Sequence, residues 1–280
     1  MYFDIEQRRS TTEDVVPLVM GVRNVTPDSF SDGGRYADVT AAFDQAMRMI
    51  AQGASVIDIG GESTRPGAMS VSVQQEIDRV VPVLERIAAA SDILLSVDSS
   101  KAQVMSAALD AGAGMLNDVR SFSEPGALEV AVKAQVPICI MHMQGEPATM
   151  QSNPSYDHVV DEVMDFLSQR LAACVEAGVP RDKIMIDPGF GFGKTLQHNL
   201  QLFAHLDDFL ALQAPILIGI SRKSLFKDLL GRPIDQRLAG ALAMTSSAVA
   251  QGVAVIRTHD VAETKDAVDV AYALAQRKRQ

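Results

Sequence analysis

The sequence has few of the features that mark secreted, disulfide-stabilised or membrane-spanning proteins. Only two cysteines, Cys139 and Cys174, occur among its 280 residues, and two are too few for a disulfide framework. No apolar run approaches the roughly 20 residues that span a bilayer. Residues 1–17 are polar and acidic and lack the apolar centre of a signal peptide. These absences predict a reduced, cytoplasmic protein.

Positive charge and internal boundaries are also scarce. The chain carries 25 Lys and Arg against 35 Asp and Glu, a net charge of −10, which argues against general nucleic-acid binding. A small anionic ligand is still compatible with this charge, because a few basic side chains can gather at one place. No linker rich in Pro, Ser or charge divides the chain, and 47% of it is hydrophobic. We therefore expect a single domain over residues 1–280.

The sequence does contain eight short apolar segments of strand character, separated by longer stretches with helical spacing. The expected strands are residues 18–25, 55–59, 93–98, 115–119, 137–142, 183–187, 215–220 and 254–258. Among the expected helices are residues 39–52, 72–90, 127–134, 156–177, 199–210, 237–251 and 261–278. The alternation predicts an α/β fold, a (β/α)8 TIM barrel, for which about 250 residues is typical. Residues 1–16 would precede the barrel as an extension that could plug its bottom.

Several expected strands end in polar residues, at the place where TIM barrels build their active sites. Asp98, Asn117 and Asp187 would form a polar patch above an apolar core. Carboxylates accept hydrogen bonds and an amide both donates and accepts, so the patch could read the edge of a nitrogen heterocycle. The alternative is that the carboxylates cap the following helices. Three further acids rank lower as candidates: Asp58, Glu62 and Asp118.

Two long loops follow the first two strands. NVTPDSFSDGG, residues 24–34, could offer oxygens of Asn24 and its acidic residues to a hard cation. GGESTRPG, residues 60–67, could hold an anion with hydroxyls, amides and Arg65. The alternative for both loops is a plain polar loop with turn residues and no ligand.

Basic residues follow the last two strands, in SRKS (221–224) and RTHD (257–260). The loops after strands 7 and 8 of a TIM barrel often build a phosphate site. Lys223, Arg257 and His259 would supply its charge, and Lys223 also admits a Schiff-base role as in aldolases.

DPGFGFGKT, residues 187–195, lacks the spacing of a phosphate-binding P-loop. Its Phe190 and Phe192, set among glycines, instead predict flexible apolar walls for a flat ring. The competing interpretation is that both rings are tucked into the core.

Taken together, the segments NVTPDSFSDGG, GASVIDIGGESTRPGA, SVDSSK, MLNDV, DPGFGFGK, GISRKS and RTHDV resemble the dihydropteroate synthase family of folate biosynthesis. They run in the family's order from residue 20 to about residue 261. Small departures are Arg23, where the family usually has an apolar residue, and Ser99, where Thr is common. The resemblance implies condensation of 6-hydroxymethyl-7,8-dihydropterin pyrophosphate with p-aminobenzoate, assisted by Mg²⁺ and inhibited by sulfonamides. It also implies a homodimer, for which the apolar surfaces of the last two expected helices are suited.

The resemblance also implies a role for each residue of the matching motifs. Pterin would be bound by Asp98, Asn117, Asp187 and Lys223, with Phe192 nearby. Mg²⁺ would be held by Asn24 together with the pyrophosphate, and the pyrophosphate itself by Thr64, Arg257 and His259. The p-aminobenzoate pocket would comprise Ser63, Arg65, Pro66, Phe30 and Phe190, with Ser224 at the carboxylate.

The chemistry implied by the resemblance is dissociative: pyrophosphate leaves, a cationic pterin methylene forms, and the neutral aryl amine attacks it. No Ser-His-Asp or Cys-His arrangement is evident in the sequence. Three alternatives remain at this point. They are a pterin-dependent corrinoid methyltransferase, a class I aldolase with a Schiff base at Lys223, and a pterin-binding protein without catalysis.

Overall fold

The structure of the protein is a computed structural model. It describes residues 16–25, 34–63, 67 and 70–278. The proposed N-terminal plug therefore falls outside the described residues, apart from Val16. Within the described ranges, no helix is both long and apolar enough to cross a membrane.

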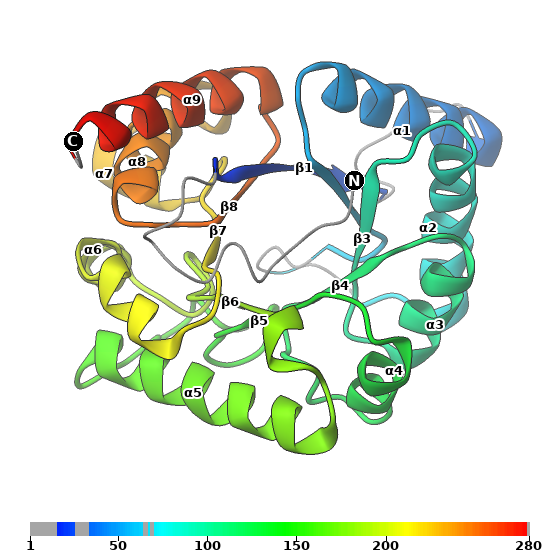
Figure 1. Ribbon diagram of the computed structural model, residues 1–280, viewed down its shortest axis with the longest axis horizontal. Helices are drawn as coiled ribbons and strands as arrows, with labels where there is room; N and C mark the ends of the chain where they lie inside the picture. The colour runs from blue at the N-terminus through cyan, green and yellow to red at the C-terminus, as the bar shows by residue number, and fades with distance from the viewer. Residues whose placement is uncertain (1–15, 26–33, 64–66, 68–69, 279–280) are drawn as a thin grey trace.

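Eight parallel strands form a barrel (Figure 1). They are β1 (Leu18–Asn24), β2 (Val56–Gly60), β3 (Leu94–Asp98), β4 (Met115–Asp118), β5 (Ile138–Met141), β6 (Ile184–Asp187), β7 (Leu217–Gly219) and β8 (Val255–Thr258). Their order is β6-β5-β4-β3-β2-β1-β8-β7, and a parallel bridge between Ile186 and Ile216 joins the two ends. The predicted (β/α)8 barrel is therefore confirmed.

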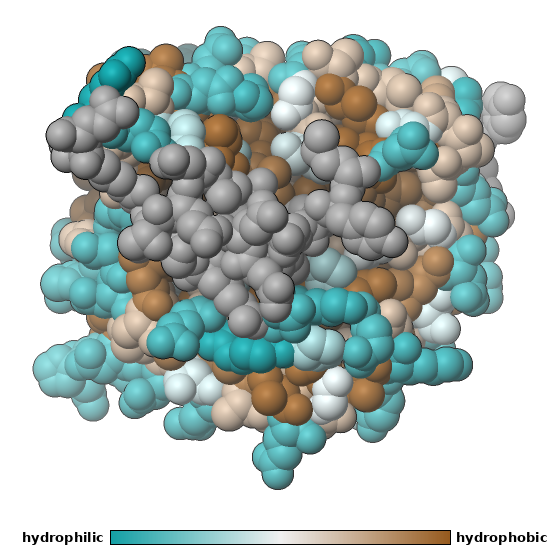
Figure 2. All heavy atoms as spheres, in the orientation of Figure 1, coloured by the Kyte–Doolittle hydropathy of each residue, from teal (hydrophilic) through white to brown (hydrophobic). Residues whose placement is uncertain are grey.

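Helices surround the strands as an outer ring (Figure 1). They are α1 (Gly34–Ala51), α2 (Val73–Ala88), α3 (Ala102–Asp110), α4 (Ala127–Ala134), α5 (Val159–Ala177), α6 (Leu196–Ala204), α7 (Leu225–Leu230), α8 (Leu238–Ala250) and α9 (Val261–Lys278). Short 3-10 helices are η3 (Arg181–Lys183), η4 (Leu206–Leu212) and η5 (Ile234–Gln236). In the same view, hydrophilic side chains predominate at the periphery of the molecule (Figure 2).

Two helical predictions differ from the structure. The stretch expected as one helix over residues 199–210 begins earlier, because Thr195 caps α6, and it breaks at His205 into η4. Helix α7 was not predicted, since six residues are too few for a periodic pattern. Helix α3 begins without a side-chain cap from Ser99 or Ser100. Lys101 precedes that helix without a side-chain cap, and the Ser100 hydroxyl hydrogen-bonds to Asp118.

The alternation of side chains along the strands explains why one barrel has an apolar floor and a polar mouth. Outward-facing residues such as Ile57 and Val97 pack against the helices in the main core. Inward-facing Met20, Val56, Met115, Cys139, Met185, Leu217 and Val255 form a separate cluster that fills the barrel centre. Side chains two residues apart share a face. The next inward positions on β2, β4, β6 and β8 are therefore Asp58, Asn117, Asp187 and Arg257.

Candidate active site

The strand register brings the polar strand ends to one level. Asn24 of β1 lies beside Gly60 of β2, Gly60 beside Asp98 of β3, and Asp98 beside Asn117 of β4. Since parallel strands in a barrel end at the same rim, residues 19 to 38 positions apart in the chain become neighbours. The polar patch predicted from Asp98, Asn117 and Asp187 thus has a structural basis in this rim.

Arg257 joins this rim from β8 and is held by two carboxylates. Its Nε donates to Asp58 Oδ2 at 2.7 Å and its Nη2 to Asp98 Oδ2 at 2.8 Å. Asn117 Nδ2 donates to the same Asp58 oxygen at 3.1 Å. Although burial lowers it, Asp58 and Asp98 together raise the pKa of Arg257 above its usual value. The guanidinium therefore stays charged and fixed in direction.

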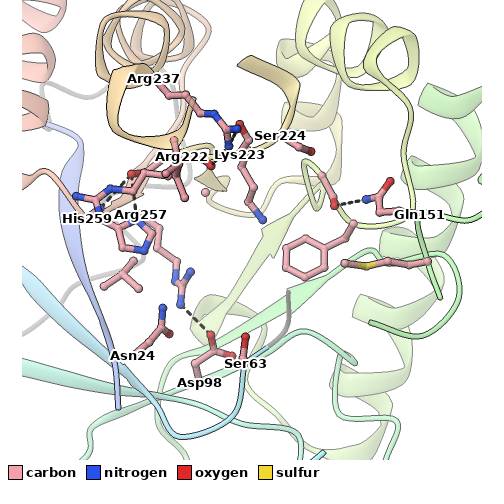
Figure 3. A pocket seen from close by; sticks show the side chains of 17 residues that line it. Asn24, Ser63, Asp98, Gln151, Arg222, Lys223, Ser224, Arg237, Arg257 and His259 are labelled. Carbon is pink, nitrogen blue, oxygen red and sulfur yellow. Dashed lines mark hydrogen bonds and ion pairs between the residues drawn. The ribbon is translucent and has the colours of Figure 1, made fainter. Parts of the chain in front are cut away.

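A cavity of about 270 Å³ opens above this network (Figure 3). Many of the predicted site residues line it: Asn24, Ser63, Asp98, Phe192, Lys223, Ser224, Arg257 and His259. Figure 3 shows Asn24, Ser63 and Asp98 on one side of the cavity, with Lys223, Ser224 and Arg237 across from them. One cavity is therefore shared by the pterin, pyrophosphate and p-aminobenzoate candidates.

The remaining predicted residues are placed differently. Asn117 and Asp187 are buried at the rim and are not among the residues that line the cavity. Phe30, Thr64, Arg65 and Pro66 lie outside the described residues.

Titratable groups at the rim have pKa values near neutrality. Burial raises the pKa of Asp98 to about 7, against the opposing effect of Arg257. Burial also raises the pKa of Asp187 to about 6, opposed by the Gly189 amide and Lys223. Burial lowers the pKa of Lys223 to about 8, with Asp187 acting in the other direction. Perturbed pKa values in a cleft are typical of functional sites.

Lys223 also contacts the aromatic wall of the cavity. Its Nζ lies 3.9 Å from the centroid of the Phe192 ring, within the range of a cation–π interaction. The ring thus holds the ammonium group at the cavity, next to where a flat ligand would stack.

Among the described residues predicted for the p-aminobenzoate pocket, Ser63 and Ser224 line the cavity and Phe190 does not. Phe190 is 1% exposed in the main core and its ring lies 5.8 Å from that of Phe203. Here the core interpretation holds for Phe190, while Phe192 lines the cavity. Two phenylalanines two residues apart differ in this way because a glycine with positive φ separates them, and the sequence does not reveal which side each ring takes.

His259 is oriented by Ser221, which follows β7. The Ser221 hydroxyl accepts from the His259 backbone N–H at 3.2 Å and lies 3.0 Å from His259 Nδ1. A hydroxyl that already accepts can still donate its own proton, which would leave Nε2 as the protonated nitrogen. The loops after β7 and β8 are joined a second time by the Arg222–Asp260 ion pair at 2.6 Å.

Sequence reasoning missed or underrated two residues of the site. Asp58 ranked low, yet it is fully buried and contacts both Arg257 and Asn117. A signal was available, because Asp58 lies two residues before Gly60 and so shares its inward direction. Arg237 was not considered. Its Nη1 donates to the carbonyls of Arg222 and Lys223 at 2.8 and 3.3 Å, and it lines the cavity (Figure 3).

The side chains at the rim offer few ligands to a metal ion. In the part of the chain that the structure describes, no group of three or more His, Cys, Asp or Glu is arranged to hold a metal. Asn24 presents an amide at the cavity, near Arg257 and His259. Mg²⁺ commonly takes one or two protein oxygens and completes its shell with water and phosphate. Asn24 is compatible with that kind of site.

Comparisons with known proteins agree with this geometry. The family model described as "Pterin binding enzyme" matches residues 20–259. Dihydropteroate synthase from Haemophilus influenzae is 49% identical over 260 residues, 93% of this chain and 94% of the relative.

Solved structures match over similar lengths. The Yersinia pestis dihydropteroate synthase with a sulfonamide drug complex has a TM-score of 0.90 and 49% identity, covering 96% of this chain and 98% of that one. The Xanthomonas albilineans enzyme in complex with 7,8-dihydropteroate has a TM-score of 0.84 and 44% identity, covering 93% and 94%. The chain therefore belongs to the pterin-binding enzymes and, among them, to the dihydropteroate synthases.

Proposed function

We propose that the cavity at the barrel mouth is where this transferase condenses 6-hydroxymethyl-7,8-dihydropterin pyrophosphate with p-aminobenzoate. The products are 7,8-dihydropteroate and pyrophosphate, in folate biosynthesis. The observation that carries the proposal is the joining of Arg257 to Asp98. It connects a group suited to a leaving anion with a group suited to a heterocycle edge. Supporting this view, a relative of similar fold is solved with 7,8-dihydropteroate.

The pterin ring would bind at the buried rim. Asp98 and Asp187 would accept from ring N–H groups and Asn117 would pair with an adjacent edge, while Lys223 would donate to the ring. Burial of these groups favours this assignment, since a ligand that leaves them unpaired is strongly rejected.

Arg257, His259 and Thr64 would bind the pyrophosphate, with Asn24 as a ligand of Mg²⁺. When bound, Mg²⁺ would supply Lewis-acid stabilisation of the leaving group. The Arg257 guanidinium is already oriented by Asp58 and Asp98, so it needs no reorganisation as negative charge develops.

Because Phe190 lies in the core and Phe192 lines the cavity, we assign the Phe192 ring to p-aminobenzoate instead of the pterin. The carboxylate of this substrate would lie near Ser224, and its edges near Ser63, Arg65, Pro66 and Phe30. Phe190 would support the aromatic wall from the core and would not face the ligand. Sulfonamides would compete for the same space, as expected from the drug complex of the Yersinia pestis relative.

The reaction would begin with cleavage of the bond between the pterin methylene carbon and the pyrophosphate oxygen, which keeps the electron pair. The carboxylate of Asp187 would stabilise the resulting cation. The lone pair of the aryl amine then attacks the methylene carbon, and the amine loses one proton. Exclusion of water would protect the cation from hydrolysis.

The corrinoid methyltransferase alternative is not favoured, because the relatives and solved structures described above are dihydropteroate synthases. The aldolase alternative is not favoured for the same reason. The Lys223 ammonium also lies against the face of Phe192, a contact that suits a binding role.

A homodimer and a cytoplasmic location complete the proposal. Val270 and Leu274 are 62% and 63% exposed on α9 and lie one turn apart, which suits packing against a second copy. Helix α9 packs beside α8 on the outside of the barrel (Figure 1). Both cysteines of the chain are buried and free, as in reduced cytoplasmic proteins.

The test of the function is a reaction of the purified protein with both substrates, with and without Mg²⁺. We expect pyrophosphate and dihydropteroate in equal amounts, dependent on Mg²⁺. Folded protein that binds the pterin but forms neither product would contradict the proposal. Sedimentation of the Leu274→Asp variant tests the dimer, which the added charge should dissociate.

A further inference from the structure

The glycine-rich loop after β6, residues 188–193, is held at nearly every step by side chains. Gly191 N donates to Asn199 Oδ1 at 2.8 Å, and Gly191 O accepts from Gln151 at 2.6 Å. Gly193 O accepts from the Tyr156 hydroxyl at 2.8 Å. The flexible walls predicted from the glycines are therefore not what the structure shows. The glycines instead allow close approach: at Gly189, φ is +73° and a Cβ would collide with the His142 carbonyl.

Lys194 lies at the centre of this arrangement. It is 3% exposed, and its Nζ contacts His142 Nδ1 at 2.9 Å, Gly189 O at 3.0 Å and Phe192 O at 3.1 Å. An ammonium group has three hydrogens to donate, and these are the three nearest acceptors. One side chain thus ties the start of the loop, the end of the loop and the segment after β5 together.

The three acceptors are all uncharged, which is unusual for a buried lysine. Two are backbone carbonyls, and the third is an imidazole that burial keeps neutral by lowering the pKa of His142 to about 3. Burial likewise lowers the pKa of Lys194 to about 7, although the nearby Asp187 raises it. Burying a cation without a carboxylate in contact is costly.

Both carbonyls held by Lys194 belong to residues that position site groups. Phe192 carries the ring that lies 3.9 Å from Lys223 Nζ. Gly189 donates its own N–H to Asp187 Oδ1 at 2.7 Å. Lys194 therefore acts on the aromatic wall and on the pterin carboxylate through backbone atoms, without lining the cavity itself.

We propose that Lys194 is a positioning residue, which sets the Phe192 ring and the Asp187 carboxylate for the condensation by binding the carbonyls of Gly189 and Phe192 and Nδ1 of His142. The inference rests on the proposed function for its kinetic consequence. Its structural consequence, a fixed loop, holds independently of the reaction.

The test is Lys194→Met, which keeps the length of the side chain and removes the donors. Misplacing reacting groups by about 1 Å can cost about 100-fold in rate. We expect the KM for p-aminobenzoate to rise and kcat to fall, each by about tenfold, while the Kd of inorganic pyrophosphate stays within about twofold. Amide hydrogen exchange of residues 189–193 should become faster. Leu84→Ala in α2, far from the loop, is the control for lost stability alone.

A second pair of variants serves if Lys194→Met does not fold. His142→Leu removes one acceptor of the ammonium, and His142→Asn places an amide oxygen near the position of Nδ1. We expect the leucine variant to show the same kinetic change in weaker form and the asparagine variant to restore it.

Unchanged exchange and unchanged kinetics in folded Lys194→Met would overturn the inference. If the wild-type protein were inactive, the proposed function would fail, and hydrogen exchange would still decide the role of Lys194.

Discussion

Asp58 Oδ2 accepts a hydrogen bond from Arg257 Nε at 2.7 Å, between residues that are 199 positions apart in the chain. The pair connects β2 to β8 across the mouth of the barrel, and Asp58 has no exposed surface. Arg257 thereby points its guanidinium along a direction that the fold sets before any ligand binds.

Removing this contact should affect stability and catalysis together. We expect Asp58→Asn to lower the free energy of unfolding by about 3 kcal/mol, the lower end for a broken buried pair, because Asp98 still binds the arginine. The kcat/KM for the pterin substrate should fall at least about tenfold as Arg257 reorients. Denaturant unfolding and steady-state kinetics measure both. Asp269→Asn, in the exposed Lys265–Asp269 pair, should cost at most about 1 kcal/mol.

The dependence of kcat/KM on pH should be bell-shaped. Asp98 and Asp187, with pKa values of about 7 and 6, take up protons as the pH falls and then no longer accept from the pterin. Lys223, with a pKa of about 8, loses its charge as the pH rises. The maximum of kcat/KM should lie between the pKa of Asp98, about 7, and the pKa of Lys223, about 8. A profile that is flat from about pH 5.5 to 9 would contradict the pterin-binding roles.

Asp187→Ala should abolish pterin binding. The substitution removes a buried acceptor at the rim and releases the Gly189 amide that it holds. Titration with a fluorescent pterin measures the Kd directly, without turnover. Asp110→Ala, at the exposed end of α3, is the matched control and should bind normally. An unchanged Kd in the Asp187 variant would refute the site assignment.

Asn24→Ala should weaken the use of Mg²⁺ without changing the affinity for the pterin ring. Asn24 lines the cavity on the side of Arg257 and His259, so its loss should raise the Mg²⁺ concentration needed for half-maximal rate about tenfold. The Kd of a pterin without pyrophosphate should not change. If affinity for Mg²⁺ and affinity for the pterin without pyrophosphate fell equally, Asn24 would belong to the pterin site instead.

His142 should make the protein sensitive to acid. Its folded pKa of about 3 lies below its ordinary value of 6.5. Between pH 3 and pH 6.5, the imidazole therefore binds a proton more readily in the unfolded chain than in the folded one. Its contribution to stability is present above pH 6.5 and is lost as the pH falls toward 3, by up to about 1.4 kcal/mol per pH unit. His142→Asn should therefore lose less stability than wild type from pH 6.5 to 4.5. Parallel stability curves for the two proteins would contradict this.

The sequence alone determined the barrel and most of the candidate rim. Short, nearly continuous apolar strands that alternate with helices admit few other architectures. Asp98, Asn117 and Asp187 stand at strand ends, where a barrel carries its chemistry. These features are local, so they are visible in the order of residues. The unusual backbone of the loop after β6 could also be predicted in part, because the sequence there is rich in glycine.

Only the tertiary structure decided which side chains meet. Asp58 became central because β8 lies two strands away from β2 and delivers Arg257 to it, a contact that depends on barrel closure. Phe190 and Phe192 point to different sides because Gly191 between them has a positive φ. Lys194 finds two acceptors in the loop after β6 and a third at His142, after β5. Contacts between distant segments depend on packing and register, and these are properties of the closed barrel that no local pattern contains.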